Sequence, residues 1–315
     1  MLSWQQCDTA MAITGLGDAA VTVRGRFSGV TEQALQFATD EHLVGVLTRA
    51  GVSPLALDGR PPPAVIFLNA GVLHRVGPHR LHVNLARQLA VRGVTSLRLD
   101  LSGIGDSHPV PGALSFRASA VVDTRAAMEQ LDADVGAKRF VLFGLCSGAD
   151  NALATAAVDE RVVGLVLVDP PAYVTSRARA RKLRARLRRL GTARAVISWG
   201  AATVARRVRA RIRAARTPAP DENDEEVSGG RGMPPVAEYR ALLTKLVDRR
   251  VAILAVFSAS LGERYNDGDQ LFELFPELRG RIDVAYFPAA NHTFTELVAQ
   301  AQLRSTVCAW MERRT

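Results

Sequence analysis

The stretch that decides the fold is Phe140-Val141-Leu142-Phe143-Gly144-Leu145-Cys146-Ser147-Gly148-Ala149-Asp150. Four apolar residues lead into a glycine, a cysteine follows two positions later, and a second glycine follows two positions after that. Alanines and a leucine then continue in a helical pattern from 152 to 157. The pattern predicts a strand, a sharp turn and a helix, with a reactive side chain held at a strained backbone position between them.

The two glycines indicate which side chain is the reactive one. Chain segments cross closely at such a turn, so the residues two before and two after the reactive residue must be small. Gly144 and Gly148 flank Cys146 in this way, whereas Ser147 would be flanked by Leu145 and Ala149. Cys146 is therefore the candidate nucleophile. The alternative is an inert buried thiol, which is what most free cysteines are.

Composition limits the class of protein. A chain of 315 residues with 48% apolar content can bury a large core and suits one large α/β domain with an insertion. No stretch approaches the roughly 18 uninterrupted apolar residues of a membrane span, and residues 1–8 lack the basic and apolar segments of a secretory signal. Three distant cysteines make neither a disulfide framework nor a metal set. We expect a cytoplasmic protein with no metal and no cofactor.

The net charge of +9 belongs to one segment. Residues 177–216 hold 15 arginines and lysines and no acidic residue, which leaves the rest of the chain with a net charge of −6. The segment has one aromatic residue, Trp199, and no recognised nucleic-acid-binding pattern, which argues against a nucleic-acid partner. Three explanations remain open: a solvated face, pairing with the acidic residues of 221–226, or attraction of an acidic partner such as a carrier protein or a coenzyme A thioester.

Strands and helices alternate along most of the chain. Residues 20–27 and 43–48 read as edge strands, and 64–68, 94–99, 140–145, 162–168, 251–257 and 282–287 read as buried strands. Helices are expected near 81–91, 115–131, 269–275 and at the C-terminus. This alternation predicts an α/β fold with a doubly wound, mostly parallel sheet, whose site lies at the carboxyl ends of the strands.

The alternation stops for about 80 residues after the strand that follows the turn. We expect a helical, arginine-rich insertion there, placed to act as a lid. The predicted organisation is a core of residues 1–172, a lid of residues 173–248 and a second core part of residues 249–315.

With these features the chain resembles the α/β-hydrolase superfamily over nearly its whole length, and it resembles a variant of that superfamily with a cysteine nucleophile. The resemblance is carried by Gly144-Leu145-Cys146-Ser147-Gly148, by the turn of residues 100–107, and by a histidine near the C-terminus that precedes a helix. The loops of residues 69–78 and 290–295 look most like exosortase-associated hydrolases and related acyl-processing enzymes of bacterial biosynthetic clusters.

The superfamily's order of nucleophile, acid and histidine implies that His292 is the base. Members usually place the acid just after the strand that is 251–257 here, where the first carboxylate is Glu263; others place it where this chain has Asp169. Asp169 is preferred, Glu263 is the alternative, and Asp267, Asp269 or no acid remain open. The resemblance also implies oxyanion donors on the backbone of Ser147 and of Ala70 or Gly71.

The histidines around 74–82 lie in or near the oxyanion-side loop, where His74, His79 and His82 either touch substrate or cap the helix. Asp100 and Asp106 are interpreted as residues that stabilise a turn. The expected reaction is cleavage of a small-molecule ester, thioester or lactone through an acyl-cysteine, by hydrolysis or by acyl transfer and ring closure, in bacterial specialised metabolism. The alternatives are elimination of an acyloxy group with His292 as base, or a binding module that has lost catalysis.

Overall fold

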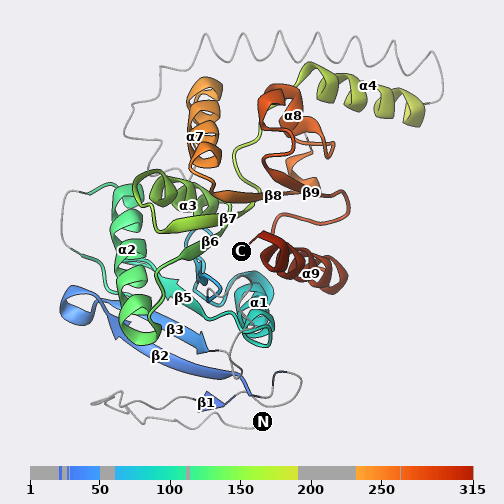
Figure 1. The fold of residues 1–315 in the computed structure, drawn as a ribbon. Coiled ribbons are helices and arrows are strands. Elements are labelled where there is room, and N and C mark those ends of the chain that lie inside the picture. Colours follow the sequence, from blue (N-terminus) through green and yellow to red (C-terminus); the bar gives the residue numbers. More distant parts are fainter. Residues whose placement is uncertain are drawn as a thin grey trace, which may run out of the picture.

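The computed structural model describes residues 21–22, 27, 29–49, 61–110, 114–190, 232–262 and 264–314. Within these ranges a single sheet runs through the molecule (Figure 1). Its strands are β1 (Val21–Thr22), β2 (Thr31–Phe37), β3 (Leu43–Arg49), β4 (Ala64–Phe67), β5 (Ser96–Asp100), β6 (Phe140–Leu145), β7 (Val162–Val168), β8 (Ala252–Ser258) and β9 (Asp283–Phe287).

The strand order in the described sheet is β1-β2-β3-β5-β4-β6-β7-β8-β9. The pairings β1–β2, β2–β3 and β3–β5 are antiparallel, and every pairing from β5 to β9 is parallel. Strands β4 and β6 in the centre of the sheet are buried along their whole length, as parallel strands covered on both faces must be. The predicted α/β class with a mostly parallel sheet is confirmed.

One N-terminal strand was not predicted. The expected strand of residues 20–27 is present as the short β1, and the longer strand is β2, Thr31–Phe37. Its sequence, TEQALQF, is mostly polar because β2 lies next to the short edge strand β1 and only part of it is buried. The carboxylate of Glu32 on β2 also has a structural role, since it pairs with the buried guanidinium of Arg98 at 2.7 Å.

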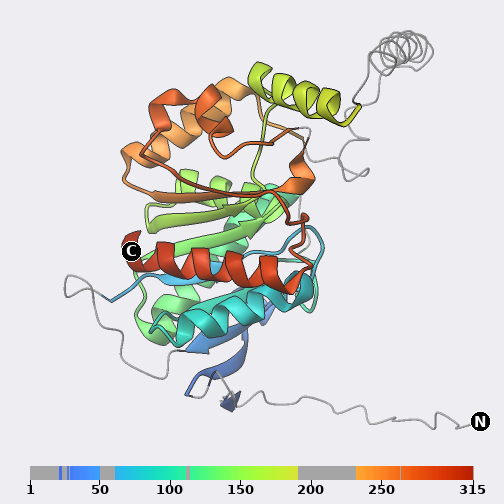
Figure 2. The ribbon, with the colours of Figure 1, turned by 90° about the vertical axis from the view of Figure 1, so that its right-hand side faces the viewer.

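Helices cover both faces of the sheet. Figure 2 shows α1 (Leu81–Ala90) and α9 (Leu297–Arg314) lying together on one face, whereas α2 (Phe116–Val135), α3 (Ser147–Val158) and α7 (Val236–Asp248) pack on the other. Successive strand residues serve opposite faces, so Phe67 packs under α1 and α9 while Ile66 belongs to the core beneath α2, α3 and α7. None of the described helices is long and apolar enough to cross a membrane.

The predicted lid begins with helix α4 (Ser176–Leu190), which lies along the top of the molecule in Figures 1 and 2. Helix α7 follows in sequence after residues 191–231, which are outside the described residues, as are the acidic residues of 221–226. The predicted lid boundaries of 173 and 248 therefore stay a prediction. The last small helix before β9 is α8 (Gln270–Leu274).

Candidate active site

Cys146 occupies the turn between β6 and α3. Its backbone has φ 58° and ψ −119°, a conformation that L-residues rarely adopt. The flanking glycines are required there: a Cβ on Gly144 would overlap the carbonyl of Gly148, and a Cβ on Gly148 would lie 2.6 Å from the carbonyl oxygen of Asn69. The strained turn thus depends on both small residues, and the thiol that it presents is only partly buried.

Asp169 follows the neighbouring strand β7 and is fully buried. Its backbone is also left-handed, with φ 49°, and its amide donates to the carbonyl of Val256 on β8 at 2.8 Å. One carboxylate oxygen accepts from the Ser258 amide at 2.7 Å, and the other accepts from the Ser258 hydroxyl at 2.7 Å. Because a buried carboxylate needs such donors, Ser258 holds Asp169 in one orientation.

His292 lies in the loop after β9 and completes the group. Its Nδ1 is 2.6 Å from the second carboxylate oxygen of Asp169, and its backbone amide donates to the Ser260 hydroxyl at 2.7 Å. Nε2 is then the ring nitrogen left for Cys146, with which the imidazole shares a hydrogen bond. The hydrogen bond with Asp169, and after it the one with Cys146, raise the pKa of His292 to about 10, although burial opposes this. The arrangement therefore favours imidazolium beside the thiol at neutral pH.

The structure brings three of the candidate residues together, Cys146, His292 and Asp169, from the ends of β6, β7 and β9. The alternative acid Glu263 lies outside the described residues. Ser258 and Ser260 were not singled out from the sequence. They stand at the position where superfamily members usually carry the acid. The absence of a carboxylate at 258–260 was therefore the sequence signal that these residues have another role.

The oxyanion side is formed by the loop after β4. Gly71 has φ 59°, and its amide donates to the Ser147 hydroxyl at 2.8 Å. Ala70 is buried, and within the described residues its amide has no acceptor in the protein. Asn69 fixes the start of the loop, because its amide nitrogen donates to Asp100 at 2.9 Å and its oxygen accepts from the Leu101 amide at 2.8 Å. The Gly71 amide thus lies beside Ser147, the first residue of α3.

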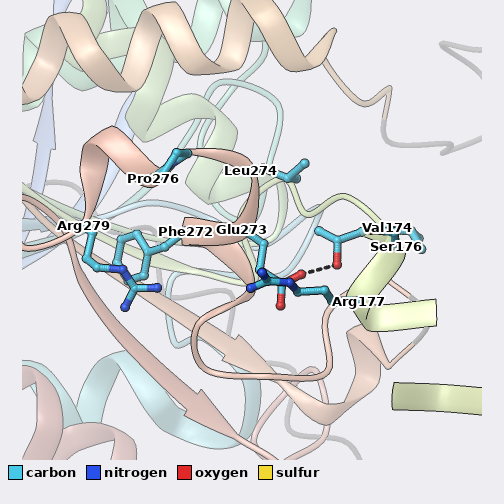
Figure 3. A pocket seen from close by; sticks show the side chains of 9 residues that line it. Val174, Ser176, Arg177, Phe272, Glu273, Leu274, Pro276 and Arg279 are labelled. Atoms are coloured by element: carbon cyan, nitrogen blue, oxygen red, sulfur yellow. Dashed lines mark hydrogen bonds between the residues drawn. The ribbon is translucent and has the colours of Figure 1, made fainter. Parts of the chain in front are cut away.

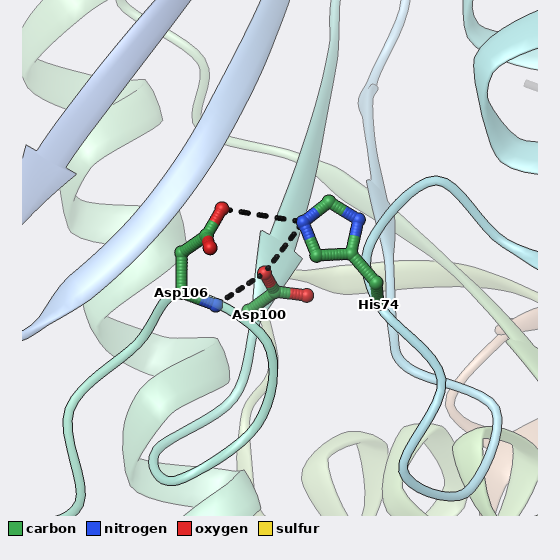
Figure 4. A group of neighbouring side chains, drawn as sticks. All are labelled: His74, Asp100 and Asp106. Carbon is green, nitrogen blue, oxygen red and sulfur yellow. Dashed lines mark hydrogen bonds and ion pairs between the residues drawn. The ribbon is translucent and has the colours of Figure 1, made fainter. Parts of the chain in front are cut away.

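A polar cluster under this loop has a structural role (Figure 4). Asp100 is fully buried and accepts from the amides of Arg75 at 2.6 Å and Asp106 at 3.1 Å, while His74 lies 3.3 Å from Asp106. Potential ligand atoms of His74, Asp100 and Asp106 lie within 4.8 Å of one another. The Arg75 guanidinium pairs with both carboxylates, so it supplies one positive charge against their two negative charges.

The expectation that His82 either touches substrate or caps the helix is wrong. His82 lies within α1, is fully buried, and packs its ring against Phe67 and Phe143 with centroids 5.4 Å apart in each case. Burial lowers its pKa to about 3, so the ring is neutral. His79, by contrast, is at the surface, where its Nε2 contacts the Thr295 hydroxyl at 3.1 Å and joins the loop after β4 to the loop of His292.

A separate hollow of about 520 Å³ lies where α4 begins (Figure 3). It is lined from α4 by Arg177 and from the α8 region by Phe272, Glu273 and Arg279 among others, and by none of Cys146, Asp169 and His292. Glu273 anchors α4, since Arg181 donates to it at 2.6 Å. Burial acts to raise the pKa of Glu273, but the hydrogen bonds from Thr175 and Arg181 outweigh it and the pKa is lowered. The basic helix is therefore fixed to the core by an ion pair.

Comparison with known proteins decides the family. The sequence model of the family described as serine aminopeptidase, S33, matches residues 61–230, which is more than half of the chain and includes Cys146 and Asp169. The chain belongs to this family. It is thus an α/β-hydrolase enzyme, although the family name specifies serine whereas this hydrolase carries Cys146 at the turn. No curated protein matches the hydrolase at a significant level.

Solved structures share the fold at low sequence identity. A hypothetical protein, PA2218, from Pseudomonas aeruginosa is 17% identical with a TM-score of 0.52, covering 91% of this hydrolase and 94% of that chain. The esterase Pf2001 from Pyrococcus furiosus is 12% identical with a TM-score of 0.52, covering 94% and 97%. A puromycin-hydrolysing peptidase from Mycobacterium tuberculosis is 14% identical with a TM-score of 0.53, covering 91% of this hydrolase and 40% of that chain.

Proposed function

We propose that this hydrolase cleaves esters, thioesters or lactones through an acyl-cysteine intermediate on Cys146, with His292 as acid and base and Asp169 as the group that orients it. The observation that carries the proposal is the hydrogen-bonded chain from Asp169 through His292 to Cys146, built from three strand ends. A nucleophile joined to a base that a third group orients is the arrangement of nucleophilic catalysis.

The first half-reaction starts from the thiolate and imidazolium that this geometry favours. The sulfur of Cys146 attacks the carbonyl carbon, and the π electrons move to the oxygen, which the backbone donors of Ser147 and of Ala70 or Gly71 stabilise. When the oxyanion collapses, the bond to the leaving group breaks and Nε2 of His292 gives its proton to that group. Acyl-cysteine, neutral His292 and a free alcohol or thiol result.

The second half-reaction needs His292 as a base. The Cys146 charge helps to raise the pKa of His292 in the free enzyme, and acylation removes that charge. The imidazole of the acyl-enzyme is therefore easier to deprotonate than that of the free enzyme, and it can take a proton from water or from another acceptor. Attack on the thioester carbonyl then breaks the C–S bond and releases an acid or a transferred acyl product, which leaves the sulfur as thiolate and the proton on His292.

Transfer and ring closure compete with hydrolysis because a thioester passes readily to other nucleophiles. A role in bacterial specialised metabolism rests on the resemblance of the loops of residues 69–78 and 290–295, and it stays a prediction. Delivery of the acyl group by an acidic carrier protein or as a coenzyme A thioester is supported by the sequence of α4, SRARARKLRARLRRL, which holds no acidic residue.

The decisive experiment is mass spectrometry of the intact protein after incubation with a panel of acyl thioesters and p-nitrophenyl esters. We expect acyl adducts on the wild type and none on Cys146→Ala. In His292→Ala the adduct should form slowly and then accumulate. Cys308 provides the matched control, because it is a second described cysteine whose pKa burial raises to about 11, so Cys308→Ala should react like the wild type.

Four outcomes would contradict the proposal. Labelling that persists in Cys146→Ala would place the nucleophile elsewhere, and product formation without any adduct in Cys146→Ala would indicate the elimination reaction with His292 as base. Full activity of Cys146→Ser would show that the thiol is incidental. The absence of any adduct or turnover in the wild type would favour a binding module.

A further inference from the structure

We propose that the hydroxyl of Ser147 is an additional oxyanion donor, oriented by the backbone amide of Gly71. This inference rests on the acyl-cysteine function proposed above. Ser147 is the first residue of α3 and directly follows the nucleophile, and its Oγ accepts a hydrogen bond of 2.8 Å from the Gly71 amide. The side chain therefore lies between the two backbone segments that supply the predicted oxyanion donors.

The hydroxyl retains a proton to give. A serine hydroxyl has one donor and two acceptor positions, and the Gly71 amide uses one of the acceptor positions. Within the described residues no protein group accepts from the Ser147 hydroxyl. A Cβ on Gly71 would meet nothing within 4 Å, so the protein leaves open space on the side of Gly71 where a side chain would project. The O–H can thus point to the position where the substrate oxygen lies.

The alternative is that the hydroxyl competes with the substrate. While the Gly71 amide is bonded to Ser147, it is not free to bond to an oxyanion. If Ser147 only occupied this donor, its removal would free the Gly71 amide and improve catalysis. If instead the amide polarises the hydroxyl, the two form a relay in which Gly71 donates to Oγ and Oγ–H donates to the oxyanion, each bond strengthening the other. No proton is transferred from Ser147 in this step.

Structure favours the relay. The Gly71 residue has a left-handed φ of 59°, and Asn69 ties the start of its loop to Asp100 and to Leu101, so the amide is held in place before substrate arrives. Ser147 is held equally well, because α3 begins at a turn that Gly144 and Gly148 allow and no other residue type would. Donors fixed before the reaction are the ones that stabilise a developing charge.

The test compares two reactions of the same thiol. Iodoacetamide alkylates Cys146 at a saturated carbon and creates no oxyanion, whereas a trifluoromethyl ketone adds to form a hemithioketal with a negatively charged oxygen. In Ser147→Ala we expect the alkylation rate to change less than about twofold and the ketone affinity and kcat for a thioester to fall by about 100- to 1,000-fold, as for loss of one oxyanion donor. Ser147→Thr, which keeps a hydroxyl, should restore most of the loss.

Ser115→Ala is the matched control, since it removes a hydroxyl from the start of another helix, α2, where it caps the Ala118 amide. Equal or tighter ketone binding by Ser147→Ala would overturn the relay while leaving the acyl-cysteine function intact. A wild type whose Cys146 is alkylated but forms neither a ketone adduct nor an acyl adduct would overturn both proposals. Parallel loss of alkylation and ketone binding in Ser147→Ala, with no rescue by threonine, would show a merely structural role.

Discussion

Replacing Asp169 by asparagine tests the core of the proposed site. The two carboxylate oxygens of Asp169 accept hydrogen bonds from the Ser258 amide, from the Ser258 hydroxyl and from Nδ1–H of His292. An asparagine side chain has only one oxygen, so its NH₂ group must take the place of the other carboxylate oxygen and face the groups that donate to it. The Ser258 hydroxyl can rotate and accept, but the backbone amide of Ser258 cannot.

The consequence falls on His292. If the asparagine oxygen stays on the Ser258 amide, its NH₂ group faces Nδ1, which must then lose its proton and accept. The neutral imidazole carries its proton on Nε2 in that tautomer and cannot take one from Cys146. The same substitution at a serine triad lowers kcat about 10⁴-fold. A thiol ionises more easily than a serine hydroxyl and depends less on the base, so we expect the rate of acylation to fall by about 10²- to 10⁴-fold. In the opposite orientation the NH₂ group of the asparagine faces the buried Ser258 amide, which then has no acceptor. Such an unpaired buried donor lowers the stability by about 1–3 kcal/mol.

Two measurements check this prediction. An NMR titration of His292 should show its pKa falling from about 10 toward 6.5 in Asp169→Asn, because the larger cause of the raised value is removed. Single-turnover acylation by a thioester should slow as stated, while Ser258→Ala, which keeps the carboxylate and loses one donor, should lose less than about tenfold since a neutral hydrogen bond contributes about 1 kcal/mol. An unchanged His292 titration together with acylation within about threefold of the wild-type rate would refute the reasoning.

Three further predictions concern the protein around the site. His292 has a folded pKa raised from 6.5 to about 10, so its contribution to stability is complete below pH 6.5 and is lost as pH rises through about 10; urea unfolding of wild type and His292→Gln should converge at high pH. Gly144→Ala should prevent folding, whereas Gly71→Ala, which meets no atom but has a left-handed φ, should cost about 1–2 kcal/mol in thermal unfolding. Arg75→Met should cost about 3–5 kcal/mol, because it leaves buried Asp100 without its cation, and loss of only a few tenths would show that the ion pair is dispensable.

The parts of this protein that local patterns encode could be predicted from the sequence. The apolar run of β7 was predicted at its observed bounds, Val162–Val168, because a strand buried on both faces needs apolar residues throughout. Strand β2 was missed because it is only partly buried and mostly polar, so it lacks a continuous apolar run. The elbow at Cys146 was predictable because its steric requirement falls on residues two positions away.

Local patterns in the chain encode the α/β class, the turn that presents Cys146, and the order in which the candidate catalytic residues occur. Which carboxylate meets the imidazole depends on the assembled sheet, since Asp169 and His292 are separated by 123 positions and meet because β7, β8 and β9 lie side by side. The same holds for Ser258 on Asp169 and for Ser147 on Gly71, which are contacts across 89 and 76 positions. Sterics within a turn act over a few residues and leave a mark in the sequence, whereas a hydrogen bond between strand ends depends on how the whole sheet is assembled.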